Sequence, residues 1–388
     1  MFASDQLRGA EIVVVGAGAV GAAITYRLAQ AGARVTCVER SFPGAGTSGN
    51  SFAWLNGHSK RPKSYHRINI MSIRDHLDLA DELGGHWVEV HGGLHWTYAD
   101  DRSKFGSLKE IVARLREWGA RVDQTTPEIA MRDLEPDVWI DPLRVSDVYV
   151  IAQEGYLDGV AMAHGAIHAA VRTYGATIQH GEVTGFMRAG QAVTGVVLAD
   201  GRELAADVVI NAAGPAAGRI AALAGVALQL DCQPGLIVCT EPAPACLKRV
   251  VHAPEMQYRP FGAGRLLLHD DEMDASAIEG QPLPLDHPVI EYSMEKARKV
   301  MPGLVGVKAE SVRVGVRPMP RDGHPIVGFE PEVPGLYTCV MHSGITLSAR
   351  MGLLVTEDLI TSDVPELVPY RQARFAEAPP GLVGASIE

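Results

Sequence analysis

The sequence predicts an α/β fold of two interleaved domains, one built on a parallel sheet and the other an α+β domain built on an antiparallel sheet. Three observations predict this fold. Residues 11–40 have the pattern strand, glycine turn, helix, strand. Buried-strand patterns return near Tyr156, after an insertion of a different kind. Residues 228–312 instead carry strand patterns around a Gly-rich turn, which is typical of antiparallel pairing.

The first unit, residues 11–40, reads EIVVVGAGAVGAAITYRLAQAGARVTCVER. Its apolar run at 12–15 is typical of a strand buried in a parallel sheet. Gly16, Gly18 and Gly21 form G-x-G-x-x-G, whose glycines permit a tight turn, close approach of a pyrophosphate and close helix–strand packing. Glu39 ends the next strand, about twenty residues past the glycines, where a carboxylate binds the ribose hydroxyls of an adenosine. Together these features predict a Rossmann-type dinucleotide site.

The remaining chain switches between two patterns. Residues 58–142 show amphipathic helices at 67–83, 108–118 and 128–134 and nothing typical of nucleotide binding. A helix at 158–174 and strands at 176–179, 183–186, 193–198 and 207–211 restore the first pattern. The first pattern is interrupted again by strands at 257–260 and 265–269 and a helix at 287–301. After them we expect a strand at 336–340, a turn at 342–346 and a helix at 347–360. We therefore predict one domain from residues 1–57, 143–227 and 313–372, a second from 58–142 and 228–312, and a tail at 373–388.

Composition excludes several classes of partner. The chain has 388 residues, 47% of them hydrophobic, and a net charge of 35 − 46 = −11 with no basic block. Such a charge disfavours nucleic acid or an anionic membrane as the main partner. Five scattered cysteines without C-x-x-C spacing predict reduced thiols, and no metal-ligand cluster is evident, so no metal site is expected. Without a signal peptide or an apolar run of membrane-spanning length, the expected location is the cytoplasm.

Several motifs together give the chain a family resemblance. These are the first unit ending in Glu39, the GTSGNS loop at 46–51, the segment GVVLADGRELAADVVINAAGPAA, and GVRPMPRDGHPIVG followed by GLYTCVMHSGITLS. With them the chain resembles the D-amino-acid oxidase family of flavoenzymes over nearly its whole length. It is most similar to the glycine oxidase, D-amino-acid dehydrogenase and sarcosine oxidase-like members.

The resemblance implies a GR2-like FAD-binding domain and a substrate-binding second domain. The first unit would hold the FAD pyrophosphate and adenosine, the GTSGNS loop would border the pyrophosphate and flavin, and MHSGIT would run under the pyrimidine end of the flavin. The helix N-terminus at MHSGIT suits the negative charge of reduced flavin. The residues that the resemblance assigns to FAD are Gly16, Gly18, Ala19, Val20, Gly21, Glu39, Arg40, Thr47, Ser48, Asn50, Ser51, Val183, Ala213, Gly214, Arg317, Gly344, Ile345 and Thr346.

The resemblance assigns the substrate to Arg317, the arginine of the G-x-R-P motif. A guanidinium grips both oxygens of a carboxylate in one plane and so fixes the α-carbon of the substrate. The alternative is a structural arginine at a strand end. Tyr258 and Arg259 are weaker candidates for the same pocket, against the alternative of ordinary strand residues. His342 would lie beside the flavin, either as a catalytic group or as a satisfied turn residue.

Two departures from the sarcosine oxidase-like pattern matter. Those members tether FAD through a cysteine where this chain has Gly315 and Val316, so FAD is expected to be non-covalent, with His58 the first other anchor to consider. They also carry a lysine that promotes reaction with oxygen, at a position where this chain has Leu266. The oxidant therefore stays open between O2 and a quinone or other electron carrier.

The activity implied by the resemblance is oxidation of the C–N bond of an amino acid or N-substituted amino acid. FAD takes a hydride from the α-carbon at its N5, and the resulting imine hydrolyses to the oxo acid. One alternative is oxidation of a 2-hydroxy acid, which needs a base for the hydroxyl proton. Another is a flavin-binding subunit of a larger dehydrogenase complex, and a homo-oligomer is also possible.

Overall fold

The computed structural model describes residues 7–98, 101, 103 and 105–375. Within these residues the first sheet has six strands, which run parallel except for the antiparallel edge strand β19. In spatial order they are β19 (Ile326–Phe329), β20 (Leu336–Val340), β13 (Val208–Asn211), β1 (Glu11–Val15), β2 (Arg34–Glu39) and β9 (Thr177–His180). The predicted α/β class with a parallel sheet is confirmed.

Both faces of this sheet are covered, which explains why β1 is a continuous apolar run rather than an alternating one. Ile12 and Val14 pack into a core with the helices, whereas Val13 and Val15 point to the opposite face. The helices of the first core are α1 (Ala19–Gln30), α2 (Lys63–Leu83), α5 (Gly159–Tyr174) and α9 (Gly344–Thr361). The second face is covered by α6 (Ala217–Leu223) and an antiparallel sheet of β10 (Val183–Ala189), β11 (Ala192–Leu198) and β12 (Glu203–Ala205).

Helices α1 and α9 pack against each other at very close range. A Cβ atom on Gly352 of α9 would lie 2.9 Å from the carbonyl oxygen of Ala23 in α1, so only glycine permits this approach. Because the two helices begin at the same edge of the sheet, their N-termini both face the same region, where β1, β13 and β20 end.

The second large sheet has eight strands in the described part of the chain. They are antiparallel except for the parallel pair of β5 with β15. In spatial order they are β18 (Ala309–Pro320), β14 (Leu230–Thr240), β17 (Arg265–His269), β16 (Gln257–Phe261), β15 (Val250–His252), β5 (Gly93–His95), β7 (Val148–Ile151) and β6 (Val122–Thr125). Helices α3 (Leu108–Glu117), α4 (Pro127–Ile129), α7 (Asp271–Asp274) and α8 (Pro288–Val300) accompany it, and a small sheet of β3 (Trp54–Leu55), β8 (Gly155–Leu157) and β4 (Val88–Glu89) lies between the two large sheets.

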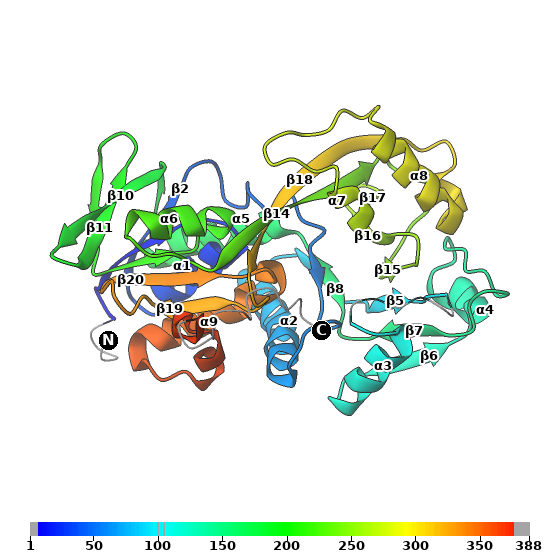
Figure 1. Ribbon diagram of the computed structural model, residues 1–388, viewed down its shortest axis with the longest axis horizontal. Coiled ribbons are helices and arrows are strands. Elements are labelled where there is room, and N and C mark those ends of the chain that lie inside the picture. The colour runs from blue at the N-terminus through cyan, green and yellow to red at the C-terminus, as the bar shows by residue number, and fades with distance from the viewer. Residues whose placement is uncertain (1–6, 99–100, 102, 104, 376–388) are drawn as a thin grey trace.

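Strands β14 and β18 join the two halves of the molecule, as Figure 1 shows. They pair along nearly their whole length, from Leu230 opposite Pro320 to Thr240 opposite Ala309. The expected boundary between residues 312 and 313 therefore falls inside β18. The division into domains stays a prediction, although the two sheets do have separate hydrophobic cores.

Most expected helices and strands lie within a few residues of their predicted ends, with three differences. Helix α9 begins at Gly344 rather than 347, so part of the expected turn is its first helical turn. The helix expected at 128–134 is a short α4 followed by a π turn at Ala130–Leu134. Residues 373–375 of the expected tail belong to a 3₁₀ turn at Gln372–Phe375, and 376–388 lie outside the described residues. None of the helices in the described part of the chain could cross a lipid bilayer.

Candidate active site

A cavity of about 1290 Å³ opens where the two halves meet. Its walls come from the glycine turn after β1, the loop at 45–61, the end of β13, strands β14 and β18, and the first turn of α9. Of the residues assigned above to cofactor or substrate, the cavity is lined by Gly16, Gly18, Ala19, Val20, Glu39, Arg40, Thr47, Ser48, Asn50, Ser51, Val183, Ala213, Gly214, Arg317, His342, Gly344, Ile345 and Thr346.

The glycine turn has the geometry that each glycine was expected to provide. Gly16 has a φ of +101°, and a Cβ on it would lie 2.7 Å from the carbonyl oxygen of Ala212. Gly21 does not line the cavity, because it packs under the turn, where a Cβ would come within 1.9 Å of the Gly16 oxygen. Gly18 is the N-cap of α1 and faces the cavity, which leaves its backbone open to a ligand.

Backbone amides hold the Glu39 carboxylate beside this turn. One oxygen accepts from the N–H of Ala17 and the other from that of Ser41, both at 2.9 Å. Ser48 Oγ accepts from the N–H of Ala19 at 3.0 Å, at the start of α1. The carboxylate is thus fixed at the carboxyl end of β2 while still lining the cavity.

The loop at 46–51 is fastened to strand β18. Thr47 donates its hydroxyl to the carbonyl oxygen of Val316 at 2.5 Å, and Asn50 donates to the carbonyls of Ala45 and Gly46. A Cβ on Gly315 would lie 2.3 Å from the carbonyl oxygen of Asn50. Position 315, one of the two residues in the region where the sarcosine oxidase-like pattern has its cysteine, is therefore too tight for a side chain unless the loop moves.

The first turn of α9 is held from three sides. Tyr65 donates its hydroxyl to Ser343 Oγ at 3.1 Å, His76 Nε2 lies 2.9 Å from the carbonyl of Ile345, and Thr346 donates to a carbonyl of β3 at 3.2 Å. Because the helix has 18 residues, its N-terminus is a favourable place for negative charge. Residues 344–346 supply its first backbone N–H groups to the cavity wall.

Arg317 is in the cavity, but it already has an acidic partner. Its Nη2 lies 2.5 Å from Asp274 Oδ2 and 3.4 Å from the carbonyl of Pro234, while its buried Nε has no hydrogen-bond partner in the described part of the chain. A Cβ on Gly235 would lie 3.2 Å from Arg317 Cζ, so glycine leaves room for the guanidinium. His269 Nε2 lies 3.5 Å from the other oxygen of Asp274.

Asp274 is held in its ionised form. Burial alone would raise its pKa, but the hydrogen bond and charge of His269, the N–H of Leu236 and the charge of Arg317 together lower it. A substrate carboxylate that binds Arg317 must therefore compete with an existing anion.

The other residues named from the sequence do not all reach the cavity. Tyr258 is fully buried in the core of the second sheet and donates to a backbone carbonyl of α8, so it cannot shape the pocket as expected. Arg259 donates to the carbonyl of Phe52, a cavity residue, and so supports the wall from behind. Leu266 is also in the second core. His342 lines the cavity just before α9.

Sequence reasoning missed several charged cavity residues, among them Lys60, Asp274 and Arg219. Burial lowers the pKa of Lys60 to about 8. Lys60 lies in the stretch assigned to the second domain, and Asp274 in a four-residue helix without any motif. A search of the sequence for a carboxylate able to pair with Arg317 would have found Asp274 as one of several candidates. The two residues come together only because β14 pairs with both β17 and β18.

The chain is similar to several known oxidoreductases over most of its length. The chain is 26% identical to the glycine oxidase of Pseudomonas aeruginosa, over 92% of this chain and 96% of that protein. It is 24% identical to an opine oxidase subunit of Agrobacterium tumefaciens, over 94% and 97%. Among solved structures, the L-proline dehydrogenase of P. horikoshii superposes with a TM-score of 0.83 at 22% identity, over 95% of this chain and 98% of that chain, which shows a shared fold.

A family model also matches most of the chain. The model described as DAO, FAD dependent oxidoreductase, matches residues 11–358, from the start of β1 to the last turns of α9. That range includes the glycine turn, Glu39, the loop at 46–51, Arg317 and the first turn of α9. The chain belongs to the DAO family of FAD-dependent oxidoreductases.

Proposed function

We propose that this oxidoreductase oxidises the C–N bond of an amino acid or an N-substituted amino acid that carries a free carboxylate. The observation that carries the proposal is Arg317, a guanidinium in the wall of the cavity that also contains the glycine turn and the first turn of α9. The glycine oxidase of Pseudomonas aeruginosa agrees with this substrate class, since its name gives an amino acid as its substrate.

The residues present fit FAD. The cavity wall includes two helix N-termini, each suited to negative charge, and a carboxylate, Glu39, held by backbone amides. Gly18 at the N-cap of α1 would receive the pyrophosphate, Glu39 the ribose, and residues 344–346 the pyrimidine end of the flavin. Ser48 and Thr47 would border the pyrophosphate.

When bound, FAD supplies a hydride acceptor at N5 for the α C–H of the substrate, and the imine product hydrolyses to the oxo acid and an amine. The protein's own part is binding and orientation. Arg317 would take the substrate carboxylate in a bidentate contact after giving up its contact with Asp274. The N–H groups of α9 would favour the negative charge that develops in reduction. No protein base is required if the amine enters in its neutral form.

FAD is expected to be held without a covalent bond, because this chain has Gly315 and Val316 where the sarcosine oxidase-like pattern has its tethering cysteine. Precipitation of the purified protein with acid should release the yellow chromophore into the supernatant. The matched sample is the same protein digested with a protease before precipitation, which reports the total flavin. Flavin that stays with the precipitated peptide would contradict the expectation, and His58 would be the first side chain to test as its anchor.

A second candidate is oxidation of a 2-hydroxy acid, and His269 favours it. That reaction needs a base for the hydroxyl proton, and His269 lines the cavity beside Asp274 and close to Arg317. The similarity to an opine oxidase subunit supports a further candidate, in which the chain works as one component of a larger assembly.

The experiment that separates these candidates is anaerobic reduction of the bound flavin. The purified protein is mixed without oxygen with D- and L-amino acids, N-methyl amino acids and 2-hydroxy acids, and loss of the yellow colour is followed. Bleaching by an amino acid supports the proposal. Bleaching by hydroxy acids alone supports the second candidate. Repeating the reaction with O2 or with a quinone as acceptor then distinguishes an oxidase from a dehydrogenase.

A further inference from the structure

A group of histidines lies in the second sheet, next to Trp54 of the small sheet, and in it His95 is buried while His252 and His58 are partly exposed. His95 on β5 and His252 on β15 are direct register partners in a parallel pair of strands. Because parallel partners stand side by side, their rings stack, with centroids 4.5 Å apart and planes 4° from parallel. The ring of His58 stacks on that of His95 at 4.9 Å, and the ring of Trp54 lies 4.0 Å from that of His252.

A carboxylate faces the two stacked rings. Glu154, in the turn between β7 and β8, is completely buried, and its Oε2 lies 2.7 Å from His95 Nε2 and 3.1 Å from Trp54 Nε1. Its backbone is fixed by hydrogen bonds to Gly92 and Ile151. The backbone of β5 makes room for it, since a Cβ on residue 93 would lie 2.0 Å from Glu154 Oε2 and glycine occupies that position.

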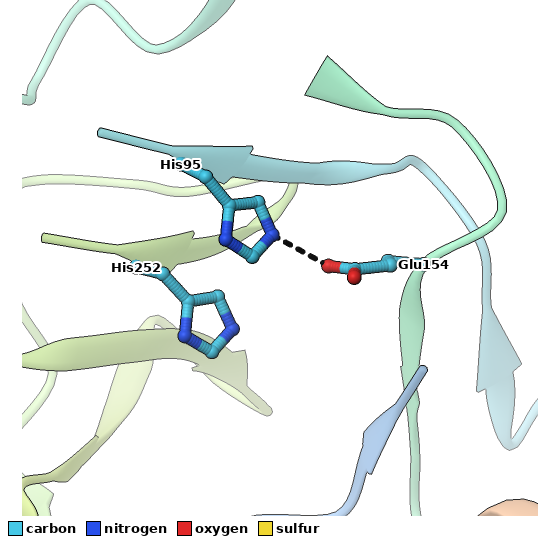
Figure 2. Close-up of side chains that lie close together, drawn as sticks. All are labelled: His95, Glu154 and His252. Atoms are coloured by element: carbon cyan, nitrogen blue, oxygen red, sulfur yellow. Dashed lines mark hydrogen bonds and ion pairs between the residues drawn. The ribbon is translucent and has the colours of Figure 1, made fainter. Parts of the chain in front are cut away.

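Several polar atoms of this group have no partner. Glu154 Oε1, His252 Nε2 and His58 Nε2 are all buried without a hydrogen bond within the described residues. A buried polar atom without a partner destabilises the folded protein unless a ligand satisfies it. Figure 2 shows that His95 and His252 each direct one nitrogen toward the side where Glu154 lies. The donor atoms of His95, His252 and Glu154 therefore lie together in one place.

The donor atoms suit a metal ion in both type and spacing. One atom each from His95, His252 and Glu154 lies within 4.8 Å of the others. Small side-chain movements would bring these atoms to the metal–ligand distances of about 2.0–2.2 Å that zinc sites use.

We propose that His95, His252 and Glu154 bind one divalent transition-metal ion of the Zn²⁺ type, with His58 or water in the fourth position. Two imidazoles and a carboxylate are a donor set suited to Zn²⁺ and unsuited to Ca²⁺ or Mg²⁺, which prefer oxygen alone. The ion would tie β5, β15 and the β7–β8 turn together behind Trp54, which lines the cavity. This site is independent of the proposed reaction, and the sequence predicted no metal site at all.

The test is metal binding to the purified flavin-containing protein. After dialysis against a chelator, the protein is titrated with Zn²⁺ while its melting temperature is followed, and with Co²⁺ while visible absorption is followed beyond the flavin bands. We expect one ion per chain by elemental analysis, a higher melting temperature with Zn²⁺ and the absorption of tetrahedral Co²⁺. Glu154→Gln and His252→Asn should each weaken binding by roughly tenfold or more and leave the flavin content unchanged.

A surface pair provides the matched control. His91 Nε2 lies 2.9 Å from Glu89 Oε2, with both side chains about half exposed, so this is also a histidine–glutamate contact, but no third ligand among the described residues is grouped with it. His91→Asn should leave metal binding unchanged. Wild-type protein that takes up less than one ion per chain would overturn the proposal, whether or not the variants fold. So would folded Glu154→Gln and His252→Asn proteins that bind as tightly as wild type.

Discussion

The cavity and the histidine group are two polar regions built in opposite ways. The cavity is large, about 1290 Å³, and one part of its wall comes from the backbone and short side chains of the glycine turn and the first turn of α9. The histidine group presents only side chains, from β5, β15 and the β7–β8 turn, and its His95 and Glu154 are buried. A site for a large anionic cofactor can thus be made from local backbone geometry, whereas a buried site for a small ion depends on strand pairing.

Within the cavity the same contrast recurs on a smaller scale. The half that begins at α1 and α9 offers backbone dipoles and one fixed carboxylate, Glu39, whereas the half beside β14 and β18 offers paired charges, Arg317 and Asp274. We assign the first half to cofactor binding and the second to substrate binding. Variants in the two halves should therefore affect different measurements.

The largest effect is expected from Arg317→Ala. Loss of a bidentate, charge-assisted contact with the substrate carboxylate should lower kcat/KM by roughly a hundredfold or more. Arg317→Lys should restore little activity, because an ammonium cannot reproduce the planar fork. Steady-state kinetics and flavin content are measured together, and flavin content should stay normal.

Arg321→Ala is the matched control for this substitution. Arg321 follows the same strand and carries the same charge, but it pairs with Gln229 and Asp231 and does not line the cavity. Its removal should leave kcat/KM nearly unchanged. Near-normal kcat/KM in Arg317→Ala would mean that the substrate is not held by a carboxylate.

A smaller effect, on the cofactor alone, is expected from Glu39→Ala. Two ribose hydrogen bonds to a charged acceptor would be lost, on the order of 1.5–3 kcal/mol each at most. The dissociation constant of FAD, measured by fluorescence titration of the apoprotein, should rise by roughly tenfold or more. Turnover at saturating FAD should change little. Glu11→Ala, which removes an exposed partner of Arg34 from the same sheet, is the control. Unaltered FAD affinity would show that Glu39 is not the ribose ligand.

The smallest effect is expected from Asp274→Asn. The amide can keep the hydrogen bond from Leu236 N–H but no longer competes as an anion for Arg317. KM should therefore fall by roughly two- to fivefold, the range of a partly exposed ion pair. A rise in KM without change in flavin content would mean instead that Asp274 orients Arg317 for the substrate.

The sequence predicts the cofactor half of the cavity well because its determinants are local. Gly16, Gly18 and Glu39 belong to one unit of about thirty residues whose geometry follows from a single strand–turn–helix–strand motif. Every residue of this unit that was assigned to FAD, except Gly21, lines the cavity. Gly21 does not line the cavity. The motif assigns it to helix–strand packing, and in the structure it packs against the backbone of Gly16.

The substrate half and the histidine group were harder to predict because their determinants are distant in sequence. Asp274 and Arg317 are 43 residues apart and meet only through strand pairing, and His95 meets His252 through the pairing of β5 with β15. Tyr258 was instead expected in the pocket and does not lie there. Its position on a strand beside the Gly-rich turn favoured a pocket role, but strand alternation turns its side chain into the second core.

The most direct test of the proposed function compares each amino acid with its own amide. The two molecules share the α C–H and the amine and differ only in the carboxylate that Arg317 would bind. Under anaerobic conditions, an amino acid that is a substrate should bleach the bound flavin. The second-order rate constant for bleaching by its amide should be lower by roughly a hundredfold or more. In Arg317→Ala protein this difference should disappear. Equal bleaching of wild-type protein by acid and amide would contradict the account.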